Sequence, residues 1–426
     1  MRSGWERAVA LGVTMFLGLG AGRAAQAQAP LPAAAPAASQ AGMPPLTLER
    51  ALRLALDNNL LLQAKQRELD AVRANEVTAG LLPNPQMTPS VTTYPSPTIY
   101  EVQIAQTIEL GGKRQRRLES AQAGTRAAAY DVEDARRQVA LQVRLAFAAI
   151  LLAQAVADQT RENLGALDQV LRLQRLRAAT GDLSELDLLR IQQARFQLES
   201  DAADAMQNLA LAKINLRTQV GPEQLPPGFE VSGAFALPEV SLSREELYAR
   251  ARQNRADIRS AQATLEKAQD DYRLAQANAV PDIQPTLGYV WSPDTSGTGS
   301  LVGVSLPLPL FNRNQGEIQR TAQEAERGRL LRDTAIIQAL SDVDVAISTL
   351  RNAQVKLAAL RDQYLPQARE IRDRSELAYR QGGASLLDYL DAQREFRAIS
   401  LTYLNSQGGY DAAYYQLEAA IGGSLQ

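Results

Sequence analysis

Apolar residues recur at intervals of three and four along most of this chain, which is the pattern of amphipathic helices. The two longest helical stretches are predicted from about Lys113 to Thr180 and from about Asn314 to Gln381. At about 1.5 Å per residue, each would reach roughly 100 Å. Shorter helices are predicted at residues 184–220 and 385–421. The pattern therefore indicates a mainly helical protein whose long helices pack side by side.

Two segments alternate with period two instead, which indicates β-strands. They lie at about residues 87–108 and 284–309, and each is predicted to form a hairpin. The first strands of these hairpins are expected at Met87–Tyr94 and Gln284–Trp291. The predicted fold class is therefore mainly α with a small β part, in which two hairpins supply four strands per chain.

The sequence is internally duplicated, with an offset of about 200 residues between the copies. The copies cover residues 46–221 and 241–422, separated by a proline-rich linker at 222–240 and followed by a short tail at 423–426. Each copy begins with a Ser or Thr that is expected to cap a helix. Each then has the same order of helix, hairpin, long helix and shorter helix.

The N-terminus has the pattern of a secretory signal peptide, predicted to cover residues 1–27. Arg2 and Arg7 precede an apolar run, and residues 25–27 place small side chains at the expected cleavage site. The alternative is a membrane anchor, but the run is shorter than the roughly 20 residues that span a bilayer. An Ala/Pro-rich tether is expected at residues 28–45. We therefore expect the mature chain to lie beyond the inner membrane.

The composition narrows the possible functions. The chain has 45 basic and 47 acidic residues, and its net charge of −2 gives no electrostatic case for nucleic acid. It contains no Cys and no His, so it lacks both disulfides and the softer metal ligands. No stretch after the N-terminus has the roughly 18 uninterrupted apolar residues of a transmembrane helix. If the protein enters a membrane, its strands must take it there.

Closure of the sheet is a further constraint. The smallest membrane barrels need about eight strands, and a sheet in lipid leaves no edge unpaired. Four strands do not close alone, so the chain must form an oligomer if its hairpins enter a membrane. The alternative is a soluble coiled-coil protein with two loop insertions.

Two motifs occupy equivalent strand-to-helix transitions, Gln106–Arg114 (QTIELGGKR) and Leu306–Gly316 (LPLPLFNRNQG). With the duplicated plan, they make the chain resemble the TolC family of outer-membrane efflux channels over essentially the whole mature sequence. The motifs are similar to those of the CzcC-like heavy-metal efflux branch. The resemblance implies a homotrimer in the outer membrane of a Gram-negative bacterium. Its twelve strands would form one transmembrane β-barrel, and its helices a periplasmic coiled-coil tunnel.

The resemblance also implies a role and partners. The chain would be the exit duct of a tripartite efflux system, passively conducting divalent metal cations or other toxic solutes to the exterior. Its partners would be a periplasmic adaptor protein, an inner-membrane pump of the resistance-nodulation-division type, and outer-membrane lipid. It would be no enzyme, and we expect no cofactor and no selective metal site.

The turns after the long helices are candidate functional sites. Gly181 and Gly382 supply backbone freedom, and Ser184 and Ser385 are expected to cap the helices that follow. A structural helix-turn-helix explains these four residues equally well. In the family, such turns form the periplasmic tip that docks the adaptor and opens and closes the channel.

Four residues near these turns are candidates for the channel entrance and its gate. Asp388 and Asp391 lie three apart, on one helical face, so threefold symmetry would stack two carboxylate rings that attract cations and raise some carboxyl pKa values. The alternative is a solvated helix face. Asp187 and Tyr379 match positions that latch the closed tip in relatives. The basic partner of Asp187 would fall at Ala384, which puts that ion pair in doubt.

Aromatic residues of the hairpins are candidates for a lipid-interface girdle. These are Tyr94, Tyr100, Tyr289 and Trp291. Two other classes of protein remain as alternatives. A periplasmic coiled-coil adaptor would also be exported and helical, but it normally has one helical hairpin inserted into small β domains. An enzyme is disfavoured because the sequence shows no nucleophile and base pair, metal cluster or cofactor loop.

Overall fold

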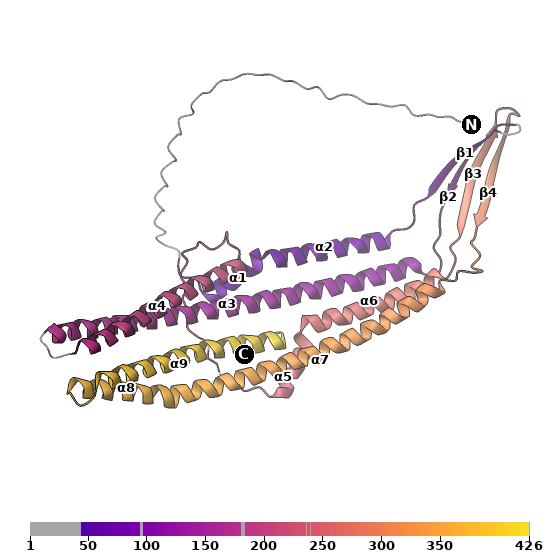
Figure 1. Ribbon diagram of the computed structural model, residues 1–426. Coiled ribbons are helices and arrows are strands. Elements are labelled where there is room, and N and C mark those ends of the chain that lie inside the picture. Colours follow the sequence, from indigo (N-terminus) through magenta and orange to yellow (C-terminus); the bar gives the residue numbers. More distant parts are fainter. Residues whose placement is uncertain (1–43, 94–96, 180–183, 236, 239, 426) are drawn as a thin grey trace, which may run out of the picture. The chain divides into compact units, whose positions relative to one another are not determined.

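The computed structural model describes residues 44–93, 97–179, 184–235, 237–238 and 240–425. Within them the chain is mainly helical, with one small antiparallel sheet, as the sequence predicts (Figure 1). The signal peptide predicted at residues 1–27 lies outside the described residues, as does most of the tether.

The two sequence copies have the same order of elements. The first copy contains α1 (Leu48–Asn58), α2 (Leu60–Gly80), β1 (Gln86–Thr92), β2 (Ile99–Ala105), α3 (Lys113–Ala179) and α4 (Glu185–Val220). The second contains α5 (Arg244–Asn254), α6 (Ala256–Asn278), β3 (Gln284–Ser292), β4 (Gly297–Ser305), α7 (Gln315–Ala359), a π-helical turn (Leu360–Tyr364), α8 (Leu365–Arg380) and α9 (Leu386–Ile421).

Helix caps explain where the copies begin. The side chain of Thr47 accepts a hydrogen bond from the N–H of Arg50, and Ser243 forms a reciprocal capping box with Glu246. The first helix of each copy is then broken, at Asn59 and at Arg255, which the sequence reading did not anticipate. Both break residues are extended in backbone conformation, so each opening segment is two helices rather than one.

The strands are shorter than the predicted β regions. β1 ends at Thr92, two residues before the predicted end of the strand at Tyr94. β4 ends at Ser305, although strand character was predicted to about residue 309. Pro307 and Pro309 explain this end, because proline has no N–H to donate to a strand ladder.

The sheet has the strand order β1-β2-β3-β4, and its register separates two kinds of side chain. Tyr100 pairs with Trp291, and Leu287 pairs with both Ile104 and Val302. Because side chains alternate along each strand, one face collects mostly apolar residues. These are Met87, Pro89, Val91, Tyr100, Val102, Ile104, Pro285, Leu287, Tyr289, Trp291, Val302 and Val304. The other face carries mainly polar or small residues, including Thr88, Ser90, Gln103, Gly288 and Gly303.

The helices bury two main clusters. One joins α1, α3 and α4 with the linker, around Val143, Ile150 and Leu216. The other joins α5, α7 and α9. By length and composition α3 is apolar enough to cross a membrane, but its apolar stretch helps to build the first cluster. In the single chain 28% of that stretch is buried, so packing inside the helical body covers part of it.

The π-helical turn distinguishes the second copy from the first. There the N–H of Leu365 bonds to the carbonyl of Leu360, one residue further back than in an α-helix. Pro366 follows at once, and proline lacks an N–H and clashes with the carbonyl four residues earlier. Ser385 and Ser184 are 201 positions apart (385 − 184), and the same offset relates Pro366 to Gly165. With Gly165 in place of proline, α3 continues as a regular helix.

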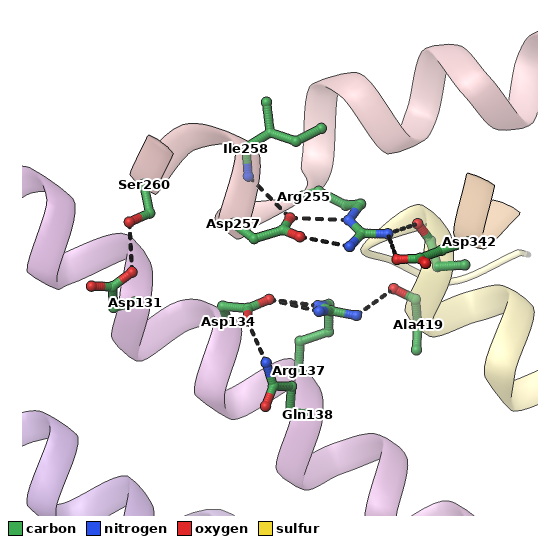
Figure 2. A network of polar contacts seen from close by, with 11 residues as sticks. Asp131, Asp134, Arg137, Gln138, Arg255, Asp257, Ile258, Ser260, Asp342 and Ala419 are labelled. Atoms are coloured by element: carbon green, nitrogen blue, oxygen red, sulfur yellow. Dashed lines mark hydrogen bonds and ion pairs between the residues drawn. The ribbon is translucent and has the colours of Figure 1, made fainter. Parts of the chain in front are cut away.

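A buried arginine holds the break between α5 and α6 (Figure 2). The Arg255 side chain is 4% exposed and pairs with Asp257 at 2.6 Å and with Asp342 of α7 at 2.9 Å. It also donates to the carbonyl of Ala420 at 3.3 Å. Arg137 of α3 donates to the neighbouring carbonyl of Ala419 at 2.9 Å. Two cations therefore satisfy the C-terminal carbonyls of α9 and tie them to α3 and to the break.

The ionisation of Asp257 depends on this arginine. Burial alone would raise the pKa of the Asp257 carboxyl, but the hydrogen bonds and charge of Arg255 outweigh burial and lower this pKa below its ordinary value. The stabilisation is therefore complete above the unfolded-state pKa of about 3.9 and is lost as the pH falls through the folded-state pKa.

We expect Arg255→Ala to destabilise the protein by about 2–4 kcal/mol near neutral pH, because it leaves two carboxylates and a helix end without their partner. The difference from wild type should shrink as the pH falls below the unfolded-state pKa of about 3.9 and through the lower folded-state pKa of Asp257. Thermal unfolding in detergent would measure both effects. The control is Arg67→Ala, whose exposed pair with Asp70 at 3.4 Å should contribute at most about 1 kcal/mol. Equal losses in the two variants would contradict the assigned role of Arg255.

Candidate functional site

The turn between α8 and α9 is built from a glycine and a cap. Gly382 has φ +77°, a left-handed conformation that favours glycine, and the N–H of Gly383 bonds to the carbonyl of Ala378 at 2.8 Å. Ser385 then begins α9 by accepting from the N–H of Asp388 at 3.2 Å. The local chemistry of this turn is therefore the one expected from its sequence.

The turn between α3 and α4 repeats this cap. Gly181 lies outside the described residues. Ser184 accepts from the N–H of Asp187 at 3.1 Å, and its hydroxyl lies 2.9 Å from the Asp187 carboxylate. Asp187 also pairs with Arg190, one turn further along α4, at 3.1 Å. Ala384 offers no basic partner, and Arg190 supplies one from the same helix.

Asp388 is the equivalent of Asp187 in the second copy. Its carboxylate accepts from the N–H and the hydroxyl of Ser385, at 3.1 and 2.7 Å. These hydrogen bonds, the hydroxyl first, lower the pKa of the Asp388 carboxyl below its ordinary value. A single chain therefore carries this negative charge at neutral pH. The rise in pKa expected from crowded carboxylates concerns assembled copies.

Asp391 lies on the same exposed side of α9 as Asp388. It pairs with Arg394 at 2.9 Å, with both side chains at least half exposed. Arg394 was not among the residues predicted from the sequence, although a spacing of three on a helix is a signal for such a pair. The candidate entrance therefore combines two carboxylates with one adjacent cation.

Tyr379 brings α8 and α9 together. Its ring stacks on that of Tyr389, with centroids 5.3 Å apart and planes 13° from parallel. Tyr389 is buried in a cluster with Leu171 of α3 and Ile191 of α4. The ends of the two helical hairpins therefore share one apolar core, at the end of the helices opposite the sheet (Figure 1).

The candidate aromatic residues of the sheet also meet. Tyr100 stacks on Trp291 at 5.1 Å between centroids, and Tyr289 lies 6.1 Å from the same tryptophan. All three belong to the apolar face of the sheet. Tyr94 lies outside the described residues. The sequence could identify these residues, but only the strand register shows that they form one group.

The described part of the chain contains no candidate metal-binding site. There, no three or more Asp and Glu side chains are grouped so that they could hold a metal ion. The features that remain as candidate sites are helix ends, exposed carboxylates and the apolar face of the sheet.

Long duplicated helices that end in a sheet with one apolar face define the class of membrane channel subunits. The family model described as "Outer membrane efflux protein" matches residues 51–222 and 247–423. These two matches span most of the chain and one falls in each sequence copy. The chain belongs to the outer membrane efflux protein family.

Individual relatives agree with this assignment. The cobalt-zinc-cadmium resistance protein CzcC of Cupriavidus metallidurans is 28% identical over 386 residues, which are 89% of this chain and 90% of that protein. A structure of the outer-membrane channel OprN has a TM-score of 0.75 at 20% identity, covering 89% of this chain and 90% of that one. A crystal structure of CusC has a TM-score of 0.75 at 18% identity, covering 88% and 92%.

The protein is thus an outer-membrane efflux channel of a Gram-negative bacterium, with a large helical periplasmic portion. The resemblance proposed from the two sequence motifs is confirmed. The family assignment excludes the two alternative hypotheses, a soluble coiled-coil protein and a periplasmic adaptor. Members of the family are channels rather than enzymes.

Proposed function

We propose that three copies of this chain form the exit duct of a tripartite efflux system. The observation that carries the proposal is the sheet, in which β1 and β4 each have one unpaired edge and one face is apolar. In lipid an unpaired edge costs several kcal/mol per backbone group. Three copies supply twelve strands, which is enough to close a barrel with the apolar face toward lipid.

The helices extend the duct into the periplasm. α3 is 67 residues long, which corresponds to roughly 100 Å. α7, the π-helical turn and α8 form a parallel path of similar length in the second copy. Assembled around one axis, these helices and their shorter return helices enclose a tunnel. The tip at Ser184 and Ser385 lies at its far end, where we propose that an adaptor protein docks beside Gly181 and Gly382.

Acidic residues at the entrance give the duct a preference for cations over anions. Threefold symmetry places the carboxylates of Asp388 and Asp391 in two rings, which attract cations and resist anions. Arg394 reduces the charge of the second ring through its pair with Asp391. Asp187 and Tyr379 are the proposed latch of the closed tip. Within one chain Asp187 pairs with Arg190 of the same helix, and Tyr379 stacks on Tyr389 of α9.

The cargo follows from both the relatives and the composition. CzcC is named for resistance to cobalt, zinc and cadmium, and CusC for cation efflux. This chain has no Cys and no His to bind such ions selectively. The duct therefore conducts divalent cations or other toxic solutes without choosing among them. An inner-membrane pump of the resistance-nodulation-division type and its adaptor make the selection and supply the energy.

Removing both entrance carboxylates, with Asp388→Ala and Asp391→Ala, should weaken block by divalent cations and raise single-channel conductance in planar bilayers. The physical reason is the loss of six negative charges from the narrowest part of the assembled trimer, two from each of three copies. The control is Asp362→Ala, an exposed carboxylate at the π-helical turn, away from the tip. Unchanged conductance and unchanged cation block in the double variant would remove these residues from the entrance.

Deleting the gene should reduce tolerance to cobalt, zinc or cadmium salts, because the pump would lose its route to the exterior. Growth across a panel of metals and organic toxins measures this, with the wild-type gene restored as the control. Restoration with Asp388→Ala and Asp391→Ala should also return tolerance, since the carboxylates tune conduction rather than create the path. A defect confined to organic compounds would contradict metal as the cargo.

A further inference from the structure

The segment that follows β4 carries an exposed apolar surface. It consists of Leu306, Leu308, Leu310 and Phe311, which we call the β4 exit segment. Phe311 is 91% exposed, more than any other large apolar side chain in the described residues. Apolar patches of this kind mark sites of interaction. We propose that the β4 exit segment is a lipid anchor, seated at the boundary of phospholipid headgroups and acyl chains on the periplasmic side of the outer membrane.

Continuity with the lipid-facing sheet is the first argument. Val302 and Val304 lie on the apolar face of β4, and Leu306, Leu308 and Leu310 continue the same alternation beyond the end of the strand. The segment stays outside any strand. Apolar residues therefore continue from the sheet to Phe311, four positions before the start of α7.

The backbone of the segment suits a membrane boundary. Pro307 and Pro309 have no N–H, so two donors that would need partners away from water are missing. The N–H of Leu310 bonds to the carbonyl of Leu308 at 2.9 Å. The two prolines thus reduce the backbone donors of the six residues 306–311 to four, and that of Leu310 has a partner within the segment.

Cations lie next to the segment and are free to meet phosphate. Arg313 donates to the carbonyl of Pro309 at 3.3 Å, and Arg114 donates to that of Gly80 at 2.6 Å. Neither arginine is in an ion pair within the described part of the chain. Their neighbours do have such partners, as Lys113 pairs with Asp282 and Arg117 with Glu109. The two guanidinium groups therefore remain available to anionic headgroups.

Both arginines lie at the strand-to-helix transitions, near the end of α6. The side chain of Asn314, next to Arg313, donates to the carbonyl of Ala275 near the end of α6 at 2.7 Å. The N–H of Leu110, four residues before Arg114, donates to Asp282, which follows α6, at 2.9 Å. The strand-to-helix transitions of the two copies thus converge on the end of α6, at the base of the sheet (Figure 1). A trimer would carry six such arginines around the membrane surface.

The anchor rests on the proposed insertion of the sheet into lipid, so the experiment reports on the two separately. The chain has two tryptophans, Trp291 in the sheet and Trp5 in the predicted signal peptide, where Trp5→Phe removes the fluorescence of any uncleaved precursor. In a Trp5→Phe background, Trp291 reports on the sheet. Trp5→Phe with Trp291→Phe and Phe311→Trp reports on the β4 exit segment. The control variant carries Trp5→Phe, Trp291→Phe and Phe196→Trp. Phe196 lies on α4 and is 71% exposed.

The assembled protein is placed in vesicles of phosphatidylethanolamine and phosphatidylglycerol that are brominated either near the headgroup or near the chain ends. We expect the Phe311→Trp fluorescence to be quenched most by bromine near the headgroup, and Phe196→Trp to be quenched only by aqueous acrylamide. Quenching of Phe311→Trp by acrylamide alone would overturn the anchor. Protection from both quenchers would overturn it too, and would assign the segment to the contact between copies. No lipid quenching of Trp291 would instead contradict insertion of the sheet.

The arginines give an independent readout. Native mass spectrometry of the detergent-released trimer counts the phosphatidylglycerol molecules that stay bound. Arg114→Gln and Arg313→Gln should each reduce this retention roughly fivefold, the value that about 1 kcal/mol per arginine near an anionic surface implies. Arg329→Gln, an exposed arginine of α7 paired with Glu326, should retain lipid as wild type does. Equal retention by all three variants would overturn the assigned role of the two arginines.

Discussion

The constraint on which the proposed assembly depends is that a sheet with an apolar face and two unpaired edges is costly as a single chain, in water and in lipid alike. Its apolar side chains are stable in lipid, yet lipid is where an unpaired strand edge is most costly. Only closure satisfies both demands. With β1 and β4 as its edges, the sheet leaves both sides open to further copies of the chain, as the proposed duct requires.

The two ends of α9 are held in place by different kinds of contact. The end of α9 is fixed by two arginines that satisfy its last carbonyls, by Gly422 packed directly against the backbone of Arg255, and by the surrounding cluster with α5 and α7. The other end of α9 is held by the smaller apolar cluster around Leu386 and Tyr389, together with a cap, a tyrosine stack and an exposed ion pair, each of which contributes about 1 kcal/mol. A channel that opens at its tip needs this difference.

Much of the fold follows from local rules in the sequence. Ser184 and Ser385 cap helices where their spacing indicates, and the period-two alternation locates all four strands. Features set by distant contacts were not predictable. The sequence around Arg255 is that of an ordinary helical arginine, and its ion pair with Asp342 of α7 joins residues 87 positions apart. The stack of Tyr100 on Trp291 required the register between two hairpins. Arg394 could have been anticipated from its spacing to Asp391, whereas the copies that complete the entrance are not encoded in any local pattern.

Closure by identical copies is the central claim, and disulfide trapping tests it most directly. The chain has no Cys, so any bond comes from introduced residues. Ser90→Cys on β1 is combined with Gly299→Cys or Gly303→Cys on β4, all on the polar face of the sheet. Oxidation in native membranes should give a covalent trimer that a reducing agent converts back to monomers. Each variant with only one of the two cysteines should give no covalent trimer. Monomers alone under every pairing, or open ladders beyond three, would contradict the account.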